Sequence, residues 1–171
     1  GGYPSRNWQQ GIFERIDDVS AQALTDKVFV KGVNCFACPI SCGRGTEIRE
    51  GQWAGRNGEG PEYETTNTLG AQCDVADMNA ITMANYLCNE YGLDTITTGA
   101  TIAWAMDCFE QGVLSVEDTG GIELCFGNAE AMVAIFTHHA EPGHRQSQGI
   151  AYSTDCGRTW TKYAANPVLP T

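Results

Sequence analysis

Three cysteines lie within eight residues of one another in the segment NCFACPISCGR, with the spacing Cys-x2-Cys-x3-Cys. Cys35, Cys38 and Cys42 can turn toward one centre if this segment forms a loop, and its proline and glycine favour a loop. Thiolates bind soft metals, so the pattern favours an iron–sulfur cluster or zinc. A structural zinc site takes four protein ligands, and no histidine or second cysteine pair lies nearby, which favours iron–sulfur. Three buried structural cysteines are the alternative interpretation.

A fourth thiol ligand has four candidates, Cys73, Cys88, Cys108 and Cys125. Cys88 falls on the apolar stripe of an expected helix, which predicts a place in the core. Cys73 is nearest to the loop in sequence and is the first candidate to test.

The composition limits the class of protein. The chain has 171 residues, 42% of them hydrophobic, which is enough for one ordinary domain and its core. No apolar run reaches the roughly eighteen residues that predict a membrane span. The net charge of -11 repels phosphate backbones and argues against nucleic acid as a partner. Eight cysteines without a secretory signal pattern favour a reducing compartment, so we expect a cytoplasmic protein.

The distribution of charge divides the chain into two parts. Residues 1–134 hold nineteen acidic and seven basic side chains, whereas residues 135–171 hold two acidic and three basic ones. All three histidines lie in the second part, and seven of the eight cysteines lie in the first. This change predicts two sequences of different origin joined in one chain.

Two long helices are expected in the first part. Apolar residues recur at the helical period over 78–91, and Gly92 follows as a C-terminal cap. A second helix is expected from Asp94 or Thr95 to Phe109, before the next glycine.

Shorter elements are expected around these two helices. Ser20 can cap a short helix that ends before Gly32, and Ser115 and Asn128 can each cap another. The stretch 43–60 contains six glycines, whose backbone entropy predicts one long loop rather than regular structure. The first part is therefore predicted to be mainly α.

The second part follows a different pattern. The segment GIAYSTDCGRTWTKY alternates apolar and polar residues about a turn at 155–157. This alternation predicts a short C-terminal β-hairpin.

Five stretches within residues 3–133 occur in the order typical of the aldehyde ferredoxin oxidoreductase family, the enzymes with a tungsten or molybdenum pterin. They are PSRNWQQGIFE, CFACPISCGR, GPEYETTNTLGAQC, NEYGLDTITTGATIAWAMDCFEQGVL and FGNAEAM. The first part, residues 1–133, therefore resembles the helical domain of that family, as an incomplete fold.

The resemblance implies a cluster site and a catalytic residue. It implies that Cys35, Cys38 and Cys42 ligate a 4Fe-4S cluster whose fourth ligand comes from polypeptide that this chain lacks. It also implies that Glu64 in GPEYE handles protons near the metal. A solvated acid is the alternative for Glu64, and Glu62 is a second candidate for the same role.

The resemblance also implies a pterin site. The family motif Asp-x-x-Gly-Leu-Asp corresponds here to Asn89, Gly92, Leu93 and Asp94, with asparagine in place of the first acid. An amide cannot match the hydrogen bonds of a carboxylate, which weakens this site. An ordinary corner between two helices is the alternative. The family's N-terminal β-rich domain and second pterin motif have no counterpart in the sequence.

The second part, residues 134–171, resembles a different family. SQGIAYSTDCGRTWTKYAANPVLP is similar to glycoside hydrolase family 32, which includes invertase, inulinase and levanase. Asp155 and Trp160 fit an Asp-box hairpin, a structural device, although Cys156 stands where the family has glycine. Glu141 and Asp155 are the only acids of this part, and neither lies in a catalytic motif of the family. Its three histidines favour a solvated loop over a metal site.

The sequence therefore predicts a fragment of an oxidoreductase that oxidises aldehydes to carboxylic acids with ferredoxin as the electron acceptor. The expected cofactors are a 4Fe-4S cluster and a tungsten or molybdenum pterin. The alternatives are a fragment of a fructan- or sucrose-acting glycoside hydrolase and an inactive metal-binding module. Alone, the chain is expected to be too incomplete for activity, and it would associate as a homo-oligomer or with the rest of the enzyme.

Overall fold

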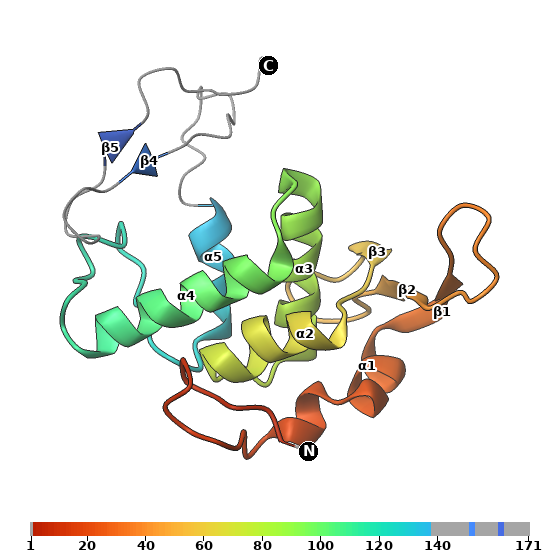
Figure 1. The fold of residues 1–171 in the computed structure, drawn as a ribbon, viewed down its shortest axis with the longest axis horizontal. Coiled ribbons are helices and arrows are strands. Elements are labelled where there is room, and N and C mark those ends of the chain that lie inside the picture. Colours follow the sequence, from red (N-terminus) through yellow and green to blue (C-terminus); the bar gives the residue numbers. More distant parts are fainter. Residues whose placement is uncertain (1, 138–150, 153–160, 163–171) are drawn as a thin grey trace. The chain divides into compact units, whose positions relative to one another are not determined.

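The computed structural model describes residues 2–137, 151–152 and 161–162. The chain forms two compact units, Gly1–His138 and His139–Thr171. The first unit combines five α-helices with a small sheet, and the pattern of helices is seen in Figure 1. Within the described residues, no helix combines the length and the hydropathy that crossing a membrane requires.

The two long helices have the predicted caps. Helix α3 spans Met78–Tyr91, and its N-cap residue Asp77 accepts hydrogen bonds from the amides of Asn79 and Ala80. It ends at Gly92, which has a left-handed backbone with φ of 68°. Helix α4 spans Thr95–Glu110, and the side chain of Asp94 caps it by accepting from the Thr97 amide. Both predictions are confirmed, because each cap depends on residues close in sequence.

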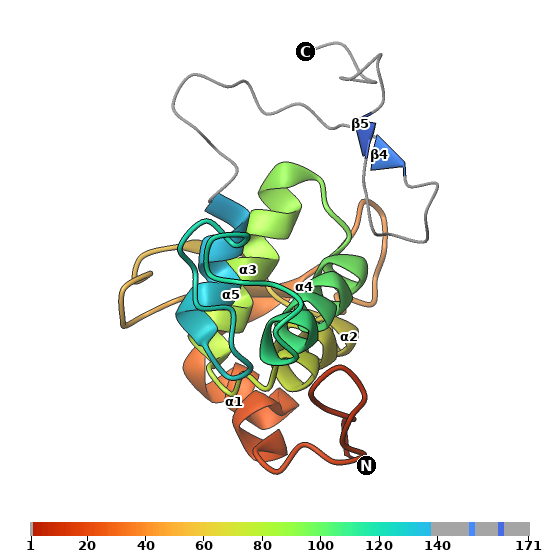
Figure 2. The same ribbon diagram turned by 90° about the vertical axis from the view of Figure 1, so that its left-hand side faces the viewer.

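Two of the three shorter helices are also confirmed. Helix α1 spans Ala21–Lys27 with Ser20 as its N-cap, and helix α5 spans Ala129–Thr137 with the Asn128 side chain accepting from the Ala131 amide. Helix α5 packs against α3, as Figure 2 shows. The helix predicted after Ser115 is wrong, because that segment forms only turns.

Ser115 and Asp118 do form reciprocal hydrogen bonds, at 2.8 to 3.2 Å between the bonded atoms. The segment is largely exposed, and Gly120 and Gly121 follow with positive φ angles. A cap without a buried face does not sustain a helix in water, since most helical stability in proteins comes from packing.

Helix α2 is short and continues directly into irregular turns. It spans Tyr63–Thr65 and is followed by a π-helical turn, η2, over Thr66–Gly70 and a 3-10 turn, η3, over Ala71–Cys73. These turns lie along α4 (Figure 1). The core of the unit lies between them and helices α3 and α5, and its fully buried side chains include Leu69, Met78, Ile81, Met106, Leu124 and Met132.

The unit contains a three-stranded antiparallel sheet, and two of its strands lie in the stretch 43–60 that was predicted to be one long loop. Strand β1 spans Phe29–Val33, β2 spans Gly43–Glu47 and β3 spans Asn57–Glu59, in the order β1-β2-β3. The loop prediction is therefore wrong for β2 and β3. Another turn, η1, over Ile16–Val19, precedes α1.

The glycines explain this error, because they permit close packing that a side chain would block. A Cβ atom at Gly58 would lie 3.1 Å from the ring of Tyr86 on α3, and one at Gly60 would overlap the methyl group of Thr46. The Thr46 hydroxyl lies 2.8 Å from the Tyr86 hydroxyl, and the Asn85 amide group donates to Glu59 O at 2.8 Å. Tertiary contacts with α3 thus offset the entropy lost by the glycines.

The N-terminal segment is held against η3 in an unusual backbone conformation. Arg6, Asn7 and Trp8 are consecutive and all have positive φ, between 50° and 68°. The three amides donate to Ala71 O, Gln72 O and the Gln72 side-chain oxygen. These bonds satisfy the amides of a turn that non-glycine residues adopt only at a cost.

Asp107 on α4 forms hydrogen bonds with the N-terminal segment. This arrangement predicts that the stability of the fold depends on pH. Its carboxylate accepts hydrogen bonds from Asn7, Gln111 and Gln9, which hold the pKa of Asp107 below the ordinary 3.8. Because the pKa is lower in the folded state, the contribution is present above pH 3.8 and is lost as the pH falls through the folded value.

We expect Asp107→Asn to lower the free energy of unfolding at neutral pH and to lose less stability than the wild type on acidification. Urea unfolding at neutral pH and at about pH 3 measures both changes. Asp18→Asn, at an exposed position in η1, is the matched control. If the wild type and Asp107→Asn lost the same free energy of unfolding on acidification, this prediction would be contradicted.

The second unit contributes one described pair of strands. Strand β4, Ala151–Tyr152, pairs antiparallel with β5, Thr161–Lys162. The turn predicted at 155–157 and the acids and histidines discussed for this part lie outside the described residues.

Candidate functional site

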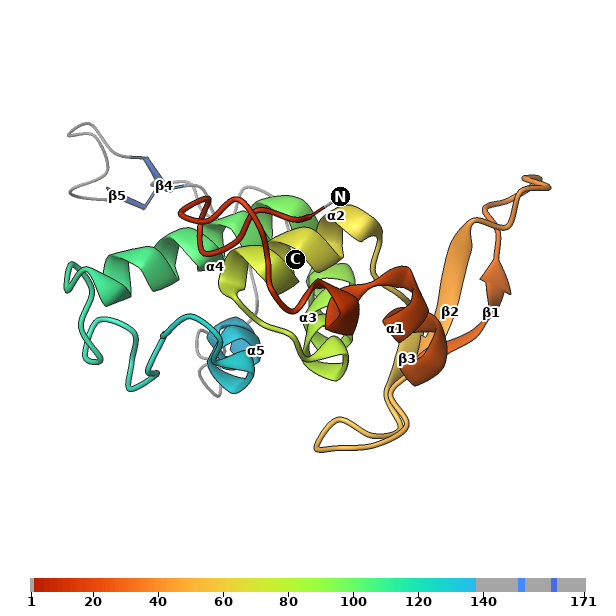
Figure 3. The ribbon, with the colours of Figure 1, turned by 90° about the horizontal axis from the view of Figure 1, so that it is seen from below.

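The cysteine loop connects β1 to β2 and projects from the helices, as Figure 3 shows. Val33 pairs with Gly43 at its base, where a Cβ atom on Gly43 would lie 2.8 Å from the Val33 side chain. Glycine is therefore needed for the two strands to approach at this point. The sheet thus fixes both ends of the loop.

Short-range hydrogen bonds shape the loop itself. The Cys38 amide donates to Cys35 O at 3.0 Å, and the Asn34 side chain donates to Cys38 O at 2.9 Å. Ala37 and Ser41 have positive φ angles of 59° and 52°. Left-handed non-glycine residues are costly and are enriched at functional sites.

The three predicted ligands are free thiols on this loop. Cys35 and Cys42 are exposed and Cys38 is half-buried. Among the described residues, no three His, Cys, Asp or Glu side chains form a group that could hold a metal ion. The three thiols therefore lie on one loop but are not gathered around one centre, and their role as ligands stays a prediction.

Two other cysteines lie in the core. Cys88 is fully buried on α3, as predicted, and burial raises its thiol pKa to about 11. Cys73 is also fully buried, its pKa is raised by burial, and its thiol donates to Thr68 O at 3.3 Å. A thiol held protonated in the core is a poor ligand, so the structure does not favour Cys73 as the fourth one.

Glu64 lies in the first turn of α2 and is half-buried. A hydrogen bond between Tyr63 and Glu64 raises the pKa of the exposed Tyr63 hydroxyl. Glu62, the second candidate in GPEYE, forms an ion pair with Arg44 instead. The two acids therefore differ in partner, and Glu64 is the one without an arginine against it among the described residues.

The predicted pterin motif forms the corner between α3 and α4. The Gly92 and Leu93 amides donate to Asn89 O and Cys88 O, which ends α3. Hydrogen bonds from Thr97 lower the pKa of Asp94, whose carboxylate accepts from the Thr97 amide at 2.7 Å. Asn89, Gly92, Leu93 and Asp94 are all exposed. The corner is thus a well-capped helix junction, and its role in binding pterin stays a prediction.

A hydrogen bond between two threonines joins this corner to the acid segment. The hydroxyls of Thr65 and Thr95 lie 2.7 Å apart, one residue beyond Glu64 and Asp94 respectively. No local sequence pattern indicates this pair, because only the packing of η2 on α4 brings the two segments together.

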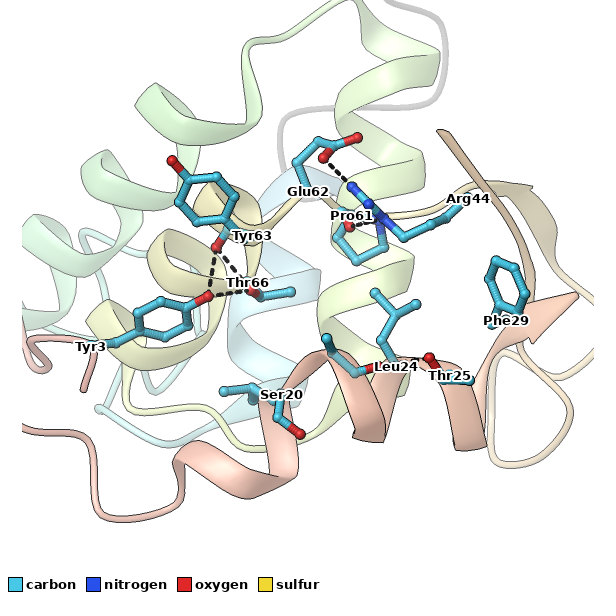
Figure 4. Close-up of a pocket in the computed structure, with 12 residues that line it drawn as sticks. Tyr3, Ser20, Leu24, Thr25, Phe29, Arg44, Pro61, Glu62, Tyr63 and Thr66 are labelled. Atoms are coloured by element: carbon cyan, nitrogen blue, oxygen red, sulfur yellow. Dashed lines mark hydrogen bonds and ion pairs between the residues drawn. The ribbon is translucent and has the colours of Figure 1, made fainter. Parts of the chain in front are cut away.

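Arg44 joins the cysteine loop to the same acid segment, and it was also missed. Its side chain donates to Cys42 O and Pro61 O and pairs with Glu62. It borders a cavity of about 260 Å³ that is also lined by Tyr3, Leu24 and Phe29 (Figure 4). Its place directly after Cys42-Gly43 in the sequence was the available signal.

Comparison with known proteins places these segments in a family. A family profile described as aldehyde ferredoxin oxidoreductase, domains 2 and 3, matches residues 1–157. This chain belongs to the aldehyde ferredoxin oxidoreductase family. The family resemblance inferred from the five stretches is therefore confirmed.

Individual relatives agree with the family. The chain is 42% identical over 135 residues to the tungsten-containing aldehyde ferredoxin oxidoreductase of Pyrococcus abyssi, covering 77% of this chain and 22% of that protein. It is 39% identical over 158 residues to that of Thermococcus kodakarensis, covering 92% of this chain and 24% of that one. The chain thus spans less than a quarter of the length of these curated relatives.

A second likeness concerns a sugar-acting enzyme. The chain is 52% identical over 58 residues to the levanase of Bacillus subtilis, covering 34% of this chain and 8% of that protein. This match supports the predicted glycoside hydrolase fragment. The boundary predicted between residues 133 and 134 stays a prediction.

The donor chemistry of the loop fits the iron–sulfur cluster of an aldehyde ferredoxin oxidoreductase. Two of the three thiols are exposed, so they are accessible to iron. Soft thiolates are the usual ligands of such clusters. Cys35, Cys38 and Cys42 stay the predicted ligands of such a cluster.

Proposed function

We propose that this chain is the part of a tungsten-containing aldehyde ferredoxin oxidoreductase that carries three ligands of a 4Fe-4S cluster and one wall of the pterin site. The whole enzyme would oxidise an aldehyde to a carboxylic acid in the reducing cytoplasm and pass the electrons to ferredoxin. The observation that supports it is the connection of three segments through residues 61–65. Arg44, on β2 next to the cysteine loop, donates to Pro61 O, and Thr95 at the helix corner hydrogen-bonds Thr65.

The cofactors would supply the redox chemistry. When bound, the pterin metal would supply two-electron redox chemistry toward the aldehyde, and the cluster would supply one-electron transfer. Oxidation of the aldehyde by water also releases protons, and the half-buried Glu64 carboxylate would accept one.

The residues of this chain would bind and orient the cofactors. The thiolates of Cys35, Cys38 and Cys42 would hold three irons of the cluster. Exposed groups at the α3–α4 corner, the amide of Asn89 and the carboxylate of Asp94, would hydrogen-bond the pterin. Because Asp94 already accepts from Thr97, its orientation is set before any ligand binds.

Anaerobic reconstitution with ferrous iron, sulfide and an added small thiol tests the cluster site. The small thiol can complete the fourth position of the cluster. We expect about four irons and four sulfides per chain, with a brown colour from sulfur-to-iron charge transfer. Uptake of zinc alone would support the inactive metal-binding module, and uptake of neither metal would overturn the proposal.

A fructan-binding fragment is the second candidate, because of the levanase match. The residues predicted for it lie largely outside the described part of the chain. Binding of levan by the full chain, measured by calorimetry, would support this candidate independently of iron content.

A further inference from the structure

Arg44 occupies the second position of β2, next to the loop that carries the thiols. Its Nη1 atom donates to Cys42 O at 3.3 Å, and its Nε atom donates to Pro61 O at 3.1 Å. Its Nη2 atom is buried and forms the ion pair with Glu62. One guanidinium therefore contacts the last predicted ligand, Cys42, and also Pro61 and Glu62 of the GPEYE segment. Figure 4 shows the contacts with Pro61 and Glu62.

The backbone of Arg44 holds the same two segments together. The Gly60 amide donates to Arg44 O at 2.6 Å, and a Cβ atom on Gly60 would lie only 3.0 Å from the Thr46 hydroxyl oxygen. A side chain at position 60 would therefore collide with Thr46 on β2. From its position on β2, Arg44 therefore contacts residues 60–62 with both its side chain and its backbone.

The chemistry of this contact requires arginine. A guanidinium presents five N–H donors in a fixed plane and keeps its charge at all ordinary pH values. Here Nε and Nη1 donate hydrogen bonds to two carbonyls, and Nη2 forms the ion pair with the Glu62 carboxylate. A lysine ammonium would keep the charge, but it cannot reproduce this fork.

The charge of Arg44 also lies beside the Cys42 peptide. A cation near a thiolate ligand favours the electron-rich form, and so favours the reduced state of a bound cluster. The side chain of Glu62 is 55% exposed, so solvent screens its opposing charge. The Arg44 side chain is only 27% exposed.

We propose that Arg44 is a positioning residue that fixes the Cys42 end of the cysteine loop against residues 60–62 and raises the reduction potential of the cluster held there. The second half of this proposal depends on the proposed function, because it needs a bound cluster. The first half concerns the chain itself. Arg44 thereby links the electron-transfer site to the segment that carries Glu64.

Hydrogen exchange of the full chain, without iron, tests the positioning role. In Arg44→Gln and Arg44→Lys we expect the amides of residues 42–46, Gly60 and Glu62 to exchange about fivefold to tenfold faster, since each lost hydrogen bond is worth roughly 1 kcal/mol. Arg56→Gln, which breaks the exposed pair with Glu90, is the matched control. Unchanged exchange in both Arg44 variants, with the fold intact by circular dichroism, would overturn this role.

A redox titration of the reconstituted chain, followed by electron paramagnetic resonance, tests the effect of charge. At a fixed potential we expect the ratio of reduced to oxidised cluster to fall about tenfold in Arg44→Gln, which is ~59 mV for one electron. Arg44→Lys keeps the charge and should stay near the wild type. Equal potentials for Arg44→Gln and Arg56→Gln would overturn the redox effect.

The two experiments separate the inference from the function it depends on. If the wild-type chain takes up no iron, the proposed function fails and the redox effect fails with it. The exchange measurement still decides whether Arg44 positions the loop.

Discussion

Replacing Gly99 with alanine should lower the free energy of unfolding by about 2 kcal/mol. Gly99 is buried in α4, and a Cβ atom there would lie 2.7 Å from the carbonyl carbon and the Cβ atom of Thr68. Those atoms belong to the π-helical turn η2 and cannot move without shifting its backbone. In an exposed helix the same change would add about 1 kcal/mol of stability through helix propensity. A loss of stability would therefore indicate the clash with Thr68, and a gain would indicate helix propensity alone.

Urea unfolding of Gly99→Ala measures this loss, and Gly11→Ala is the matched control. Nothing lies within 4 Å of a Cβ atom at Gly11, so its replacement should change stability by less than about 0.5 kcal/mol. A Gly99→Ala variant as stable as the wild type would show that α4 does not pack against η2 this closely.

Replacing Cys38 with alanine should abolish loading of the iron–sulfur cluster. Loss of a hydrogen-bonding partner outside the metal ligands already weakens metal binding by about 10- to 100-fold, so loss of a ligand should weaken it by more than that. Iron analysis and absorbance after anaerobic reconstitution measure the effect. Because Cys38 lies half-buried on a projecting loop, we expect little change in thermal stability.

Cys125→Ala is the control for this experiment, since it removes an exposed thiol outside the loop. It should keep the iron content of the wild type. If Cys38→Ala also keeps it, residues 35–42 do not form the cluster site, and the proposed function loses its main support.

The helices show which features can be predicted from local sequence. Asp77, Gly92 and Asp94 cap or end helices through bonds to residues at most four positions away, and Gly92 and Asp94 were predicted as boundaries. Ser115 has the same chemistry, and yet no helix follows it, because its segment buries no apolar face. Local signals therefore locate a helix boundary only where packing supports the helix.

The sheet shows the opposite case. The glycines of 43–60 predicted a loop, since each costs backbone entropy. In the structure Gly58 and Gly60 let strand β3 approach Tyr86 and Thr46, side chains that lie 28 and 14 positions away in the sequence. Such contacts depend on the placement of α3, which no local pattern contains.

By itself, the sequence of this family member determined the helix caps, the spacing of the three thiols and the motifs that assign the family, because each depends on neighbouring residues. Only the tertiary structure decided that Cys73 lies in the core, that β2 and β3 form, and that Arg44 and Thr95 meet residues 61–65. The hydrogen bond between Arg44 and Pro61 joins residues 17 positions apart, and the one between Thr65 and Thr95 joins residues 30 positions apart. Their partners are selected by the packing of strands and helices, which propensity and spacing do not specify.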